Sequence, residues 1–532
     1  MIPSLRPQRY TLARLRNAAL TLPLALGVLA LNAPSTAAWA QDAPLAESDA
    51  QPGASVVADA ELTAETVDTK PEILPIDFEA ELSPLTRDRL FRDSRVGVQV
   101  VRVADGESVF SRESAKPLVP ASTVKVLTAA TALKVLGPAY RYTTDLYSDG
   151  EVDQAGVLRG NLYIKGHGDP TLVVEKLWKL VYDLKLEGID RISGNVVFDE
   201  GYFDSAYRMP GWGKQRDIVM GPSYFATSSA LSLNFNTVTL VVGPGTEVGK
   251  AARVRLETAA GGYVTVENEV STGAIGSRRQ LEIKREVTAE GMTFTLTGSI
   301  PSDDDARRYY RTVEDPTEHF IAAWTEMEKV HGITVSGKHI RGETPVSASL
   351  ISQHRSVPLT AVLMDMNKYS NNFMAEQVLK TLGAEAGGAP GTVDKGLAAV
   401  GDYLTEIGVP KESFTLHNGS GLSREARLTP GALTSVMVDM ANDDKVGNEF
   451  KSSLSIAGGD GTLWRRMAEE PGRVRGKTGT IDGVHCLTGY VTARDGELYA
   501  FSFLVNDLRG GSSPAKRLHD RFLRRMFNAA DL

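Results

Sequence analysis

The sequence predicts an α/β protein of the α+β type, in which an antiparallel sheet is flanked by helices and split by a mostly β insertion. Strand-like segments joined by a tight turn occur near residue 100, and three more lie near the end of the chain. Between them, residues 146–349 contain short alternating runs of apolar and polar side chains separated by glycine-rich turns. Because strands joined by short turns pair antiparallel, we expect the two ends of the chain to form one domain around this insertion.

Length and composition are those of a multidomain globular protein. The chain has 532 residues, of which 42% are hydrophobic and 23% charged, so it can bury a substantial core. The net charge of −8 is uneven, because residues 41–80 hold ten acidic residues against Lys70 alone. This stretch lacks helical periodicity and is predicted to be a disordered acidic leader. No basic stripe with interleaved aromatic residues occurs, which argues against nucleic-acid binding.

Residues 1–40 have the pattern of a cleaved signal peptide. An apolar core, Ala18 to Leu31, precedes the small-x-small site Ala38-Trp39-Ala40, which places the mature start at Gln41. The basic region before the core holds Arg6, Arg9, Arg14 and Arg16. We expect export to the periplasm through general secretion, because there is no twin-arginine pair. The mature chain is expected to lack a transmembrane span; an uncleaved anchor is the alternative, and loose membrane association is left open.

The catalytic domain is predicted to begin with a hairpin and a buried helix. Val98 to Val103 alternates as a strand does, Asp105-Gly106 is a turn signal, and Val109-Phe110 begins the return strand. A helix follows Pro120 and is apolar on nearly every face, which indicates burial.

The end of the chain is predicted to be a three-stranded meander followed by a helix. The strands are 473–477, 483–491 and 498–505. Ser513 can cap the helix, with Pro514 at its first position and one apolar face formed by Leu518, Phe522 and Met526. The single cysteine, Cys486, lies in the second of these strands and is expected to be buried.

The predicted boundaries follow from this pattern: signal peptide 1–40, leader 41–80, catalytic domain 81–145 and 350–532, and β-rich insertion 146–349. Two helices are expected within the insertion, at 171–184 and 317–330. Its strands are expected at 161–164, 194–198, 237–242, 254–258, 281–287 and 293–297.

The first of three short motifs is Ser122-Thr123-Val124-Lys125. A spacing of three residues places Ser122 and Lys125 on one helical face, where a neutral lysine amine can take the serine proton. Burial and a nearby cation favour the neutral amine. The alternative is an exposed helical turn without catalytic function.

The second motif, Ser370-Asn371-Asn372, lies between two apolar helical stretches and is predicted to be a loop. Ser370 can relay a proton from Lys125 to a leaving amine, and the Asn372 amide can orient a lysine and a substrate carbonyl. The alternative is a helix cap formed by an asparagine, and Asn371 is expected to have that role.

The third motif, Lys477-Thr478-Gly479, lies on the first strand of the meander. Lys477 and Thr478 can hold a carboxylate by charge-assisted hydrogen bonds. Gly476 and Gly479 allow another backbone to approach. The backbone N–H groups of Thr480 and Ser122 can form an oxyanion hole. A surface lysine on a strand is the alternative.

Together the motifs resemble those of the serine penicillin-binding proteins. The long insertion is similar to that of the class C low-molecular-mass branch, the D-alanyl-D-alanine carboxypeptidase/endopeptidases. Four further strings support the resemblance, which extends from about Leu82 to the C-terminus: Gly166-His167-Gly168-Asp169-Pro170-Thr171-Leu172, Ser229-Ala230-Leu231-Ser232-Leu233-Asn234, Asn418-Gly419-Ser420-Gly421-Leu422-Ser423-Arg424 and Ala457-Gly458-Gly459-Asp460-Gly461-Thr462-Leu463.

The resemblance implies a penicilloyl-serine transferase (β-lactamase/transpeptidase-like) fold with two smaller domains nested in the insertion. It implies peptidoglycan stem peptides as substrates, with Ser122 as the nucleophile, and β-lactams as covalent inhibitors. Arg424 matches a clamp for the diaminopimelate side chain, whereas Asp482 stands where related enzymes place a neutral amide. Asn371 stands where the wider superfamily often has Asp.

Two other functions remain as alternatives: a β-lactamase of the same fold, and a non-catalytic module that binds the wall or senses β-lactams. The long insertion argues against the first and the complete motifs against the second. No cofactor or metal is expected, because H-E-x-x-H is absent and the eight histidines are scattered. Ser420 is not in a G-x-S-x-G elbow, which disfavours a Ser-His-Asp triad.

Overall fold

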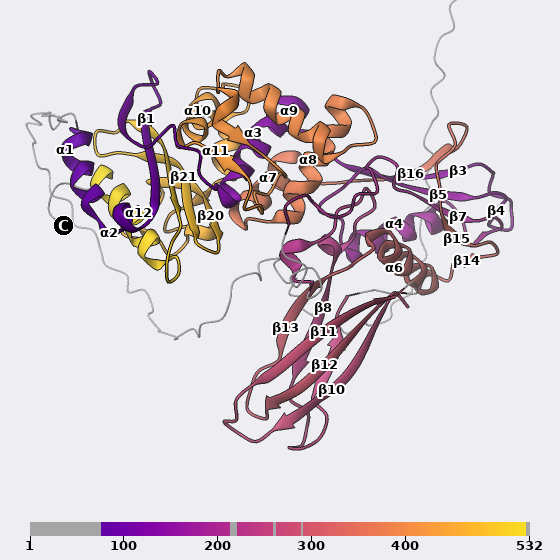
Figure 1. Cartoon of the computed structure of the whole chain (residues 1–532). Helices are drawn as coiled ribbons and strands as arrows, with labels where there is room; N and C mark the ends of the chain where they lie inside the picture. Colours follow the sequence, from indigo (N-terminus) through magenta and orange to yellow (C-terminus); the bar gives the residue numbers. More distant parts are fainter. Residues whose placement is uncertain (1–75, 213–220, 259–261, 289–290, 528–532) are drawn as a thin grey trace, which may run out of the picture. The chain divides into compact units, whose positions relative to one another are not determined.

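The computed structural model describes residues 76–212, 221–258, 262–288 and 291–527 (Figure 1). The predicted signal peptide, and the predicted leader up to residue 75, lie outside these ranges. Helix α1 (Phe78–Leu82) begins before the expected boundary, so the last residues assigned to the leader belong to the fold. A 3-10 turn (Ser83–Arg87) and α2 (Arg89–Asp93) lead into the first strand.

A six-stranded antiparallel sheet forms the centre of the catalytic domain. Its order is β19-β20-β21-β22-β1-β2. The two N-terminal strands therefore pair with a meander from the far end of the sequence, as the strand patterns predicted. The bounds are β1 (Arg95–Arg102), β2 (Ser108–Arg112), β19 (Ser455–Ile456), β20 (Val474–Ile481), β21 (Val484–Thr492) and β22 (Leu498–Asn506).

Alternate side chains of the sheet enter two different cores. One face packs on α1 and α12 (Ser513–Phe527) through Leu487, Phe501 and Phe503, together with Leu518 and Phe522. The helix begins one residue earlier than expected, because the Ser512 carbonyl accepts the Lys516 N–H. The apolar spacing of the last helix thus identified its buried face correctly.

The other face packs on a larger helical core that also holds the buried Cys486. Its central helix is α3 (Lys125–Leu136), preceded by the 3-10 turn Ala121–Val124 that carries Ser122. Residues 125–133 of α3 are all buried, as the apolar pattern predicted. Surrounding helices are α7 (Leu359–Lys368), α8 (Asn372–Gly387), α9 (Val393–Glu406), α10 (Pro430–Ala441) and α11 (Gly447–Ser453).

The insertion begins and ends with two strands that pair with each other, β3 (Thr143–Ser148) and β16 (Ser349–Arg355). The boundaries expected at 145/146 and 349/350 fall within these strands. They belong to a sheet of order β15-β7-β5-β3-β16, which shares a core with two helices. The other bounds are β5 (Leu162–Gly166), β7 (Val196–Asp199), β15 (His339–Arg341), α4 (Val174–Leu186) and α6 (Pro316–His331), with the small sheet β4 (Val157–Leu158), β6 (Arg191–Ile192) and β14 (Thr334–Val335).

A second hydrophobic cluster forms between two three-stranded sheets. The sequence pattern missed β10 and β13, because both strands present mostly polar side chains to solvent. We propose that the two clusters mark the two nested domains. The strands are β8 (Thr237–Gly243), β9 (Arg253–Leu256), β10 (Val264–Gly273), β11 (Gln280–Thr288), β12 (Gly291–Pro301) and β13 (Arg307–Thr312).

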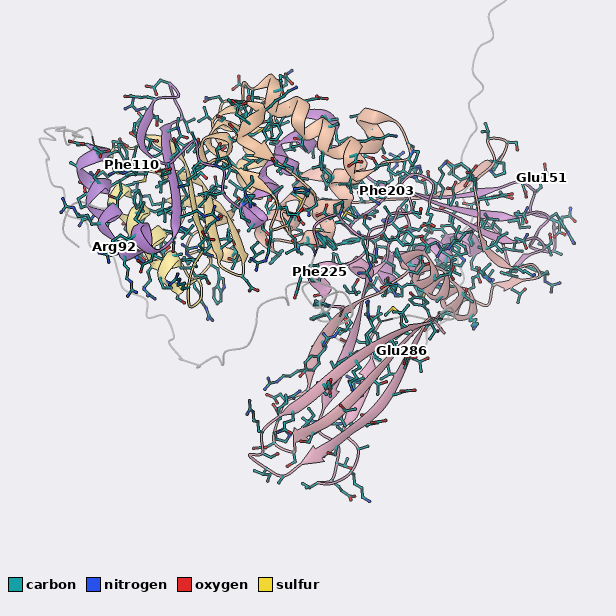
Figure 2. All side chains as sticks on the ribbon, viewed as in Figure 1. Arg92, Phe110, Glu151, Phe203, Phe225 and Glu286 are labelled. Atoms are coloured by element: carbon teal, nitrogen blue, oxygen red, sulfur yellow. The ribbon has the colours of Figure 1, made fainter. Side chains whose placement is uncertain are left out.

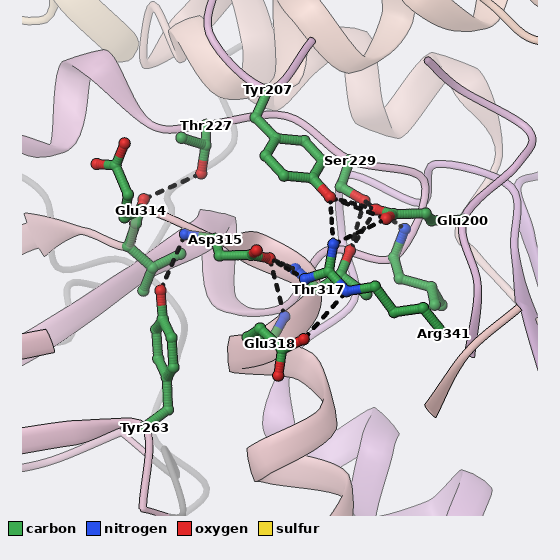
Figure 3. Close-up of polar contacts among 12 residues, drawn as sticks. Glu200, Tyr207, Thr227, Ser229, Tyr263, Glu314, Asp315, Thr317, Glu318 and Arg341 are labelled. Carbon is green, nitrogen blue, oxygen red and sulfur yellow. Dashed lines mark hydrogen bonds and ion pairs between the residues drawn. The ribbon is translucent and has the colours of Figure 1, made fainter. Parts of the chain in front are cut away.

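An arginine-centred network joins the parts of the insertion (Figure 3). The Arg341 guanidinium donates to Glu200 (3.1 Å), to Asp315 at the start of α6 (2.5 Å) and to the Tyr207 hydroxyl (2.8 Å). Ser229 donates to the same Glu200 carboxylate at 2.9 Å. These contacts fix the segments 200–212 and 221–229 against α6 and β15.

Described residues of these two segments also pack on the helical core of the catalytic domain. Met209, Trp212 and Phe225 are buried among its residues, and Figure 2 labels Phe225 in this region. Among the described residues, no helix is both long and apolar enough to cross a membrane.

The apolar contact between α12 and the sheet predicts a large stability effect. Phe522 is 2% exposed, and its ring centroid lies 5.1 Å from that of Phe503 and 5.4 Å from that of Phe110. We expect Phe522→Ala to lower the unfolding free energy by about 3–5 kcal/mol, because it leaves a cavity. Urea unfolding followed by circular dichroism measures this. The exposed Arg517→Ala should change it by less than about 0.5 kcal/mol; equal effects would contradict the packing argument.

Candidate active site

The first motif lies where the 3-10 turn meets α3. The Lys125 side chain is 0% exposed, and its amine donates a hydrogen bond to the Ser122 hydroxyl at 3.1 Å. Ala121 has a left-handed φ of 47°, which turns the chain sharply just before the serine. Ser122 itself is half-buried, so its hydroxyl is held by the lysine yet open to a ligand.

The second motif forms the loop between α7 and α8. The Asn372 carbonyl oxygen accepts from the Lys125 amine at 2.7 Å, and its amide nitrogen donates to the Tyr224 carbonyl at 3.0 Å. These opposite partners fix the orientation of the amide. Asn371 caps α8 by accepting from the Met374 N–H at 3.1 Å, as expected. Since Asp caps helices equally well, Asn at this position preserves the cap.

The third motif lies on β20 and reaches the second through a buried amine. Lys477 donates to the Ser370 hydroxyl at 2.9 Å and to the Thr478 carbonyl at 2.8 Å. Ser370 has a left-handed φ of 57°, an uncommon backbone for serine that turns it toward this strand. The structure therefore brings the three motifs together through Lys125 and Lys477.

Gly479 explains how β20 approaches the serine. A Cβ at this position would lie 2.7 Å from the Pro120 carbonyl oxygen and 3.1 Å from the Ser122 nitrogen. Only glycine therefore lets the strand pass this close to the nucleophile. The next residue, Thr480, is exposed, and its hydroxyl pairs with Nδ1 of His485 at 2.8 Å. Thr478 is half-buried and donates to the Thr462 hydroxyl at 2.9 Å.

Arg424 lies on a loop and contacts the residue that follows the third motif. Its guanidinium is 3.5 Å from the Asp482 carboxylate, and the two side chains are 61% and 101% exposed. An exposed pair of this kind is weak. It leaves the guanidinium able to exchange Asp482 for another carboxylate.

Two backbone carbonyls and one acid at the site were not found by sequence reasoning. Lys125 donates to the Ser420 carbonyl at 2.9 Å, and the Tyr224 carbonyl holds Asn372. Backbone acceptors leave no signal in a sequence. Glu376 is 0% exposed and accepts from the Gly419 and Ser420 N–H groups at 2.8 and 2.9 Å. A lone acid within the apolar run of α8 was its available signal.

Burial gives both lysines unusual acidity. It lowers the pKa of Lys125 to about 7, an effect that the Glu376 carboxylate opposes. Burial, and then the charge of Lys125, lower the pKa of Lys477 well below its ordinary value. A neutral Lys125 next to a serine hydroxyl can act as a general base. The arrangement can therefore activate Ser122 for attack on a carbonyl.

The fold and these three motifs define the class C low-molecular-mass penicillin-binding proteins, whose fold is that of β-lactamases and transpeptidases. Residues 78–524 match the model of the D-Ala-D-Ala carboxypeptidase 3 (S13) family. The chain belongs to this family and is a serine carboxypeptidase hydrolase.

Relatives agree over most of the chain. A D-alanyl-D-alanine carboxypeptidase of Actinomadura sp. (strain R39) is 34% identical over 82% of this chain and 82% of its own. The D-alanyl-D-alanine carboxypeptidase DacB of Haemophilus influenzae is 27% identical over 83% of this chain and 91% of its own.

Solved structures show the same fold. The crystal structure of penicillin binding protein 4 (dacB) from Haemophilus influenzae has a TM-score of 0.73 at 24% identity, and covers 85% of this chain and 100% of its own. That protein has also been solved in complex with a β-lactam.

Gly421 lies in the loop that contacts α3, and its substitution is expected to disturb the site. Gly421 has a φ of 76°, and a Cβ there would lie 2.0 Å from the Ala121 carbonyl oxygen. We expect Gly421→Ala to displace the Ser122 turn and to slow acylation by about 10²-fold, measured as the rate of fluorescent penicillin labelling. Gly401→Ala is the control, since nothing lies within 4 Å of its added Cβ. Normal labelling of the Gly421 variant would contradict this geometry.

The acidity of Lys125 predicts the pH profile. If its neutral form acts as the base, the acylation rate should rise with pH, level off above the pKa of about 7, and fall tenfold per pH unit below it. Stopped-flow acylation measured across pH tests this. Lys125→Arg stays charged and should not recover activity at high pH; a flat profile of the wild type would contradict the assignment.

Proposed function

We propose that this enzyme removes the terminal D-Ala from peptidoglycan stem peptides through an ester on Ser122. The observation that carries the proposal is the Lys125 amine, which contacts the Ser122 hydroxyl at 3.1 Å and the Asn372 amide at 2.7 Å. This geometry joins a nucleophile, its base and an orienting amide. Family membership supports the same reaction.

Acylation proceeds in two proton transfers. Lys125 takes the Ser122 proton as the serine oxygen attacks the carbonyl carbon of the penultimate D-Ala. The C–N bond then breaks, and the proton passes through Ser370 to the amine of the departing D-Ala. Water attacks the resulting ester, giving the shortened peptide as a carboxylate and returning the proton to Ser122. No other reactant is needed for this balance.

Binding residues surround the reacting carbonyl. We assign the terminal carboxylate to Lys477 and Thr478, with Gly479 admitting the strand. Burial favours the neutral amine of Lys477. The negative charge of an incoming carboxylate favours the protonated amine instead. The N–H groups of Ser122 and Thr480 are assigned to the oxyanion hole, where each donor contributes about 3–4 kcal/mol. Arg424 is assigned to the stem-peptide side chain.

The same chemistry extends to endopeptidase action. When the amine of a diaminopimelate side chain replaces that of terminal D-Ala, the acyl group on Ser122 is the same and only the leaving group differs. We therefore include cleavage of D-Ala–diaminopimelate cross-links. Asp482 beside Arg424 bears on the preference between stem peptides, because a substrate carboxylate must displace it.

β-Lactams are proposed to acylate Ser122 and to clear slowly. The alternative, a β-lactamase, would hydrolyse them with sustained turnover, so a chromogenic β-lactam should give one burst per enzyme and then near-arrest. The remaining alternative is a non-catalytic wall-binding or β-lactam-sensing module. The pattern of residues 1–40 supports a periplasmic location.

Purified muropeptides test the function directly. We expect mass spectrometry to show loss of one alanine from pentapeptides and splitting of cross-linked dimers. Ser122→Ala should abolish both products and the penicillin label, because it removes the attacking oxygen. Circular dichroism of that variant serves as the folding control. A wild type that binds muropeptides without cleaving them would instead identify the binding module.

A further inference from the structure

Glu376 is a buried acid that the reaction described above does not use. It lies one helical turn after Asn372 on α8, so both side chains point to the same side of the helix. Its side chain is 0% exposed. An ionised carboxylate is costly to bury unless it is paired or hydrogen-bonded, so its contacts indicate its role.

Both carboxylate oxygens of Glu376 bind the loop that touches the base. They accept from the Gly419 and Ser420 N–H groups at 2.8 and 2.9 Å. The carbonyl of that same Ser420 accepts from the Lys125 amine at 2.9 Å. Burial raises the pKa of Glu376, whereas these backbone donors and the charge of Lys125 oppose that rise and favour the ionised acid. The carboxylate thus holds the peptide unit whose other end orients the lysine.

The charge of this carboxylate raises the pKa of two buried lysines, Lys125 and Lys380. Lys380, one turn further along α8, is buried but donates to Asp204 of the insertion at 2.6 Å. Burial lowers the pKa of Lys477 on β20 well below its ordinary value, and the charge of Lys125 lowers it further. Glu376 is the acid whose charge favours protonation of Lys125.

We propose that Glu376 is a positioning residue that fixes the Gly419–Ser420 peptide and sets the charge state of the Lys125 amine. The proposal rests on the acyl transfer proposed above. Burial alone would make the amine too weak a base to take a serine proton efficiently. The carboxylate restores base strength, so that the amine is neutral near pH 7 yet still accepts a proton.

The test is the pH profile of penicillin acylation, measured under pseudo-first-order conditions. In Glu376→Gln the uncharged amide keeps the shape, so the acid limb should move to lower pH by about one unit or more. The plateau rate should fall, because the base is weaker. Glu376→Asp keeps the charge one methylene further away, and should move the limb in the same direction by less.

Thr128→Val is the matched control. The Thr128 hydroxyl donates to the Gly419 carbonyl at 2.8 Å, so this variant loosens the same loop without changing any charge. Its acid limb should coincide with that of the wild type. If Glu376→Gln does not fold, a downward shift in Glu376→Asp that Thr128→Val lacks still supports the proposal.

An acid limb that stays in place in folded Glu376→Gln, or that moves equally in Thr128→Val, would overturn the role of Glu376. Failure of the proposed function would look different, because the wild type itself would then release no D-Ala and take no penicillin label.

Discussion

The buried amine of Lys125 is the contact on which the site depends. It bonds to the Ser122 hydroxyl on the preceding 3-10 turn, to Asn372 at the start of α8 and to the Ser420 carbonyl on a loop. Because a buried amine cannot rely on water for partners, each of these groups must stay in place. The geometry of three distant segments is therefore set by the hydrogen-bonding needs of one side chain.

Burial and nearby charge then determine the protonation state of that amine. Burial lowers the pKa of this amine and makes it a base, while the charge of the buried Glu376 carboxylate raises that pKa. The amine in turn lowers the pKa of the second buried lysine, Lys477. None of these groups is open to solvent, so salt screens them little. The protonation state of the amine is therefore set by burial and by nearby charge. Gly479 lets β20 come close enough to place Lys477 at the site.

Local sequence patterns were sufficient to predict many elements of this fold. The hairpin after Arg95, the mostly apolar α3 and the spacing of Leu518 and Phe522 each matched the element observed. Strand β10 was missed because Val264, Val266 and Val270 are its only large apolar residues, and the polar run Glu267 to Glu269 interrupts their alternation. α4 begins at Val174 rather than Thr171, since the Asp169 carboxylate accepts from the Thr171 N–H and holds a turn there.

The three motifs could be located from residue types and spacing, but their surroundings could not. The carbonyls of Tyr224 and Ser420 belong to the backbone, which every residue supplies equally. The role of Glu376 is apparent only from the folded structure, because its hydrogen-bond partners, Gly419 and Ser420, lie in a loop that follows it in sequence. The importance of Glu376 therefore depends on tertiary contacts and not on a sequence motif.

The order of strands in the sheet also governs when the site can be completed. Strand β1 pairs with β22, so Val98 must wait for Phe503 to leave the ribosome. At ordinary elongation rates that interval is on the order of tens of seconds. Throughout it the nascent chain carries a serine and its base but lacks Lys477. The contact between Lys477 and Ser370 can therefore form only when the last strands of the chain are available to the sheet.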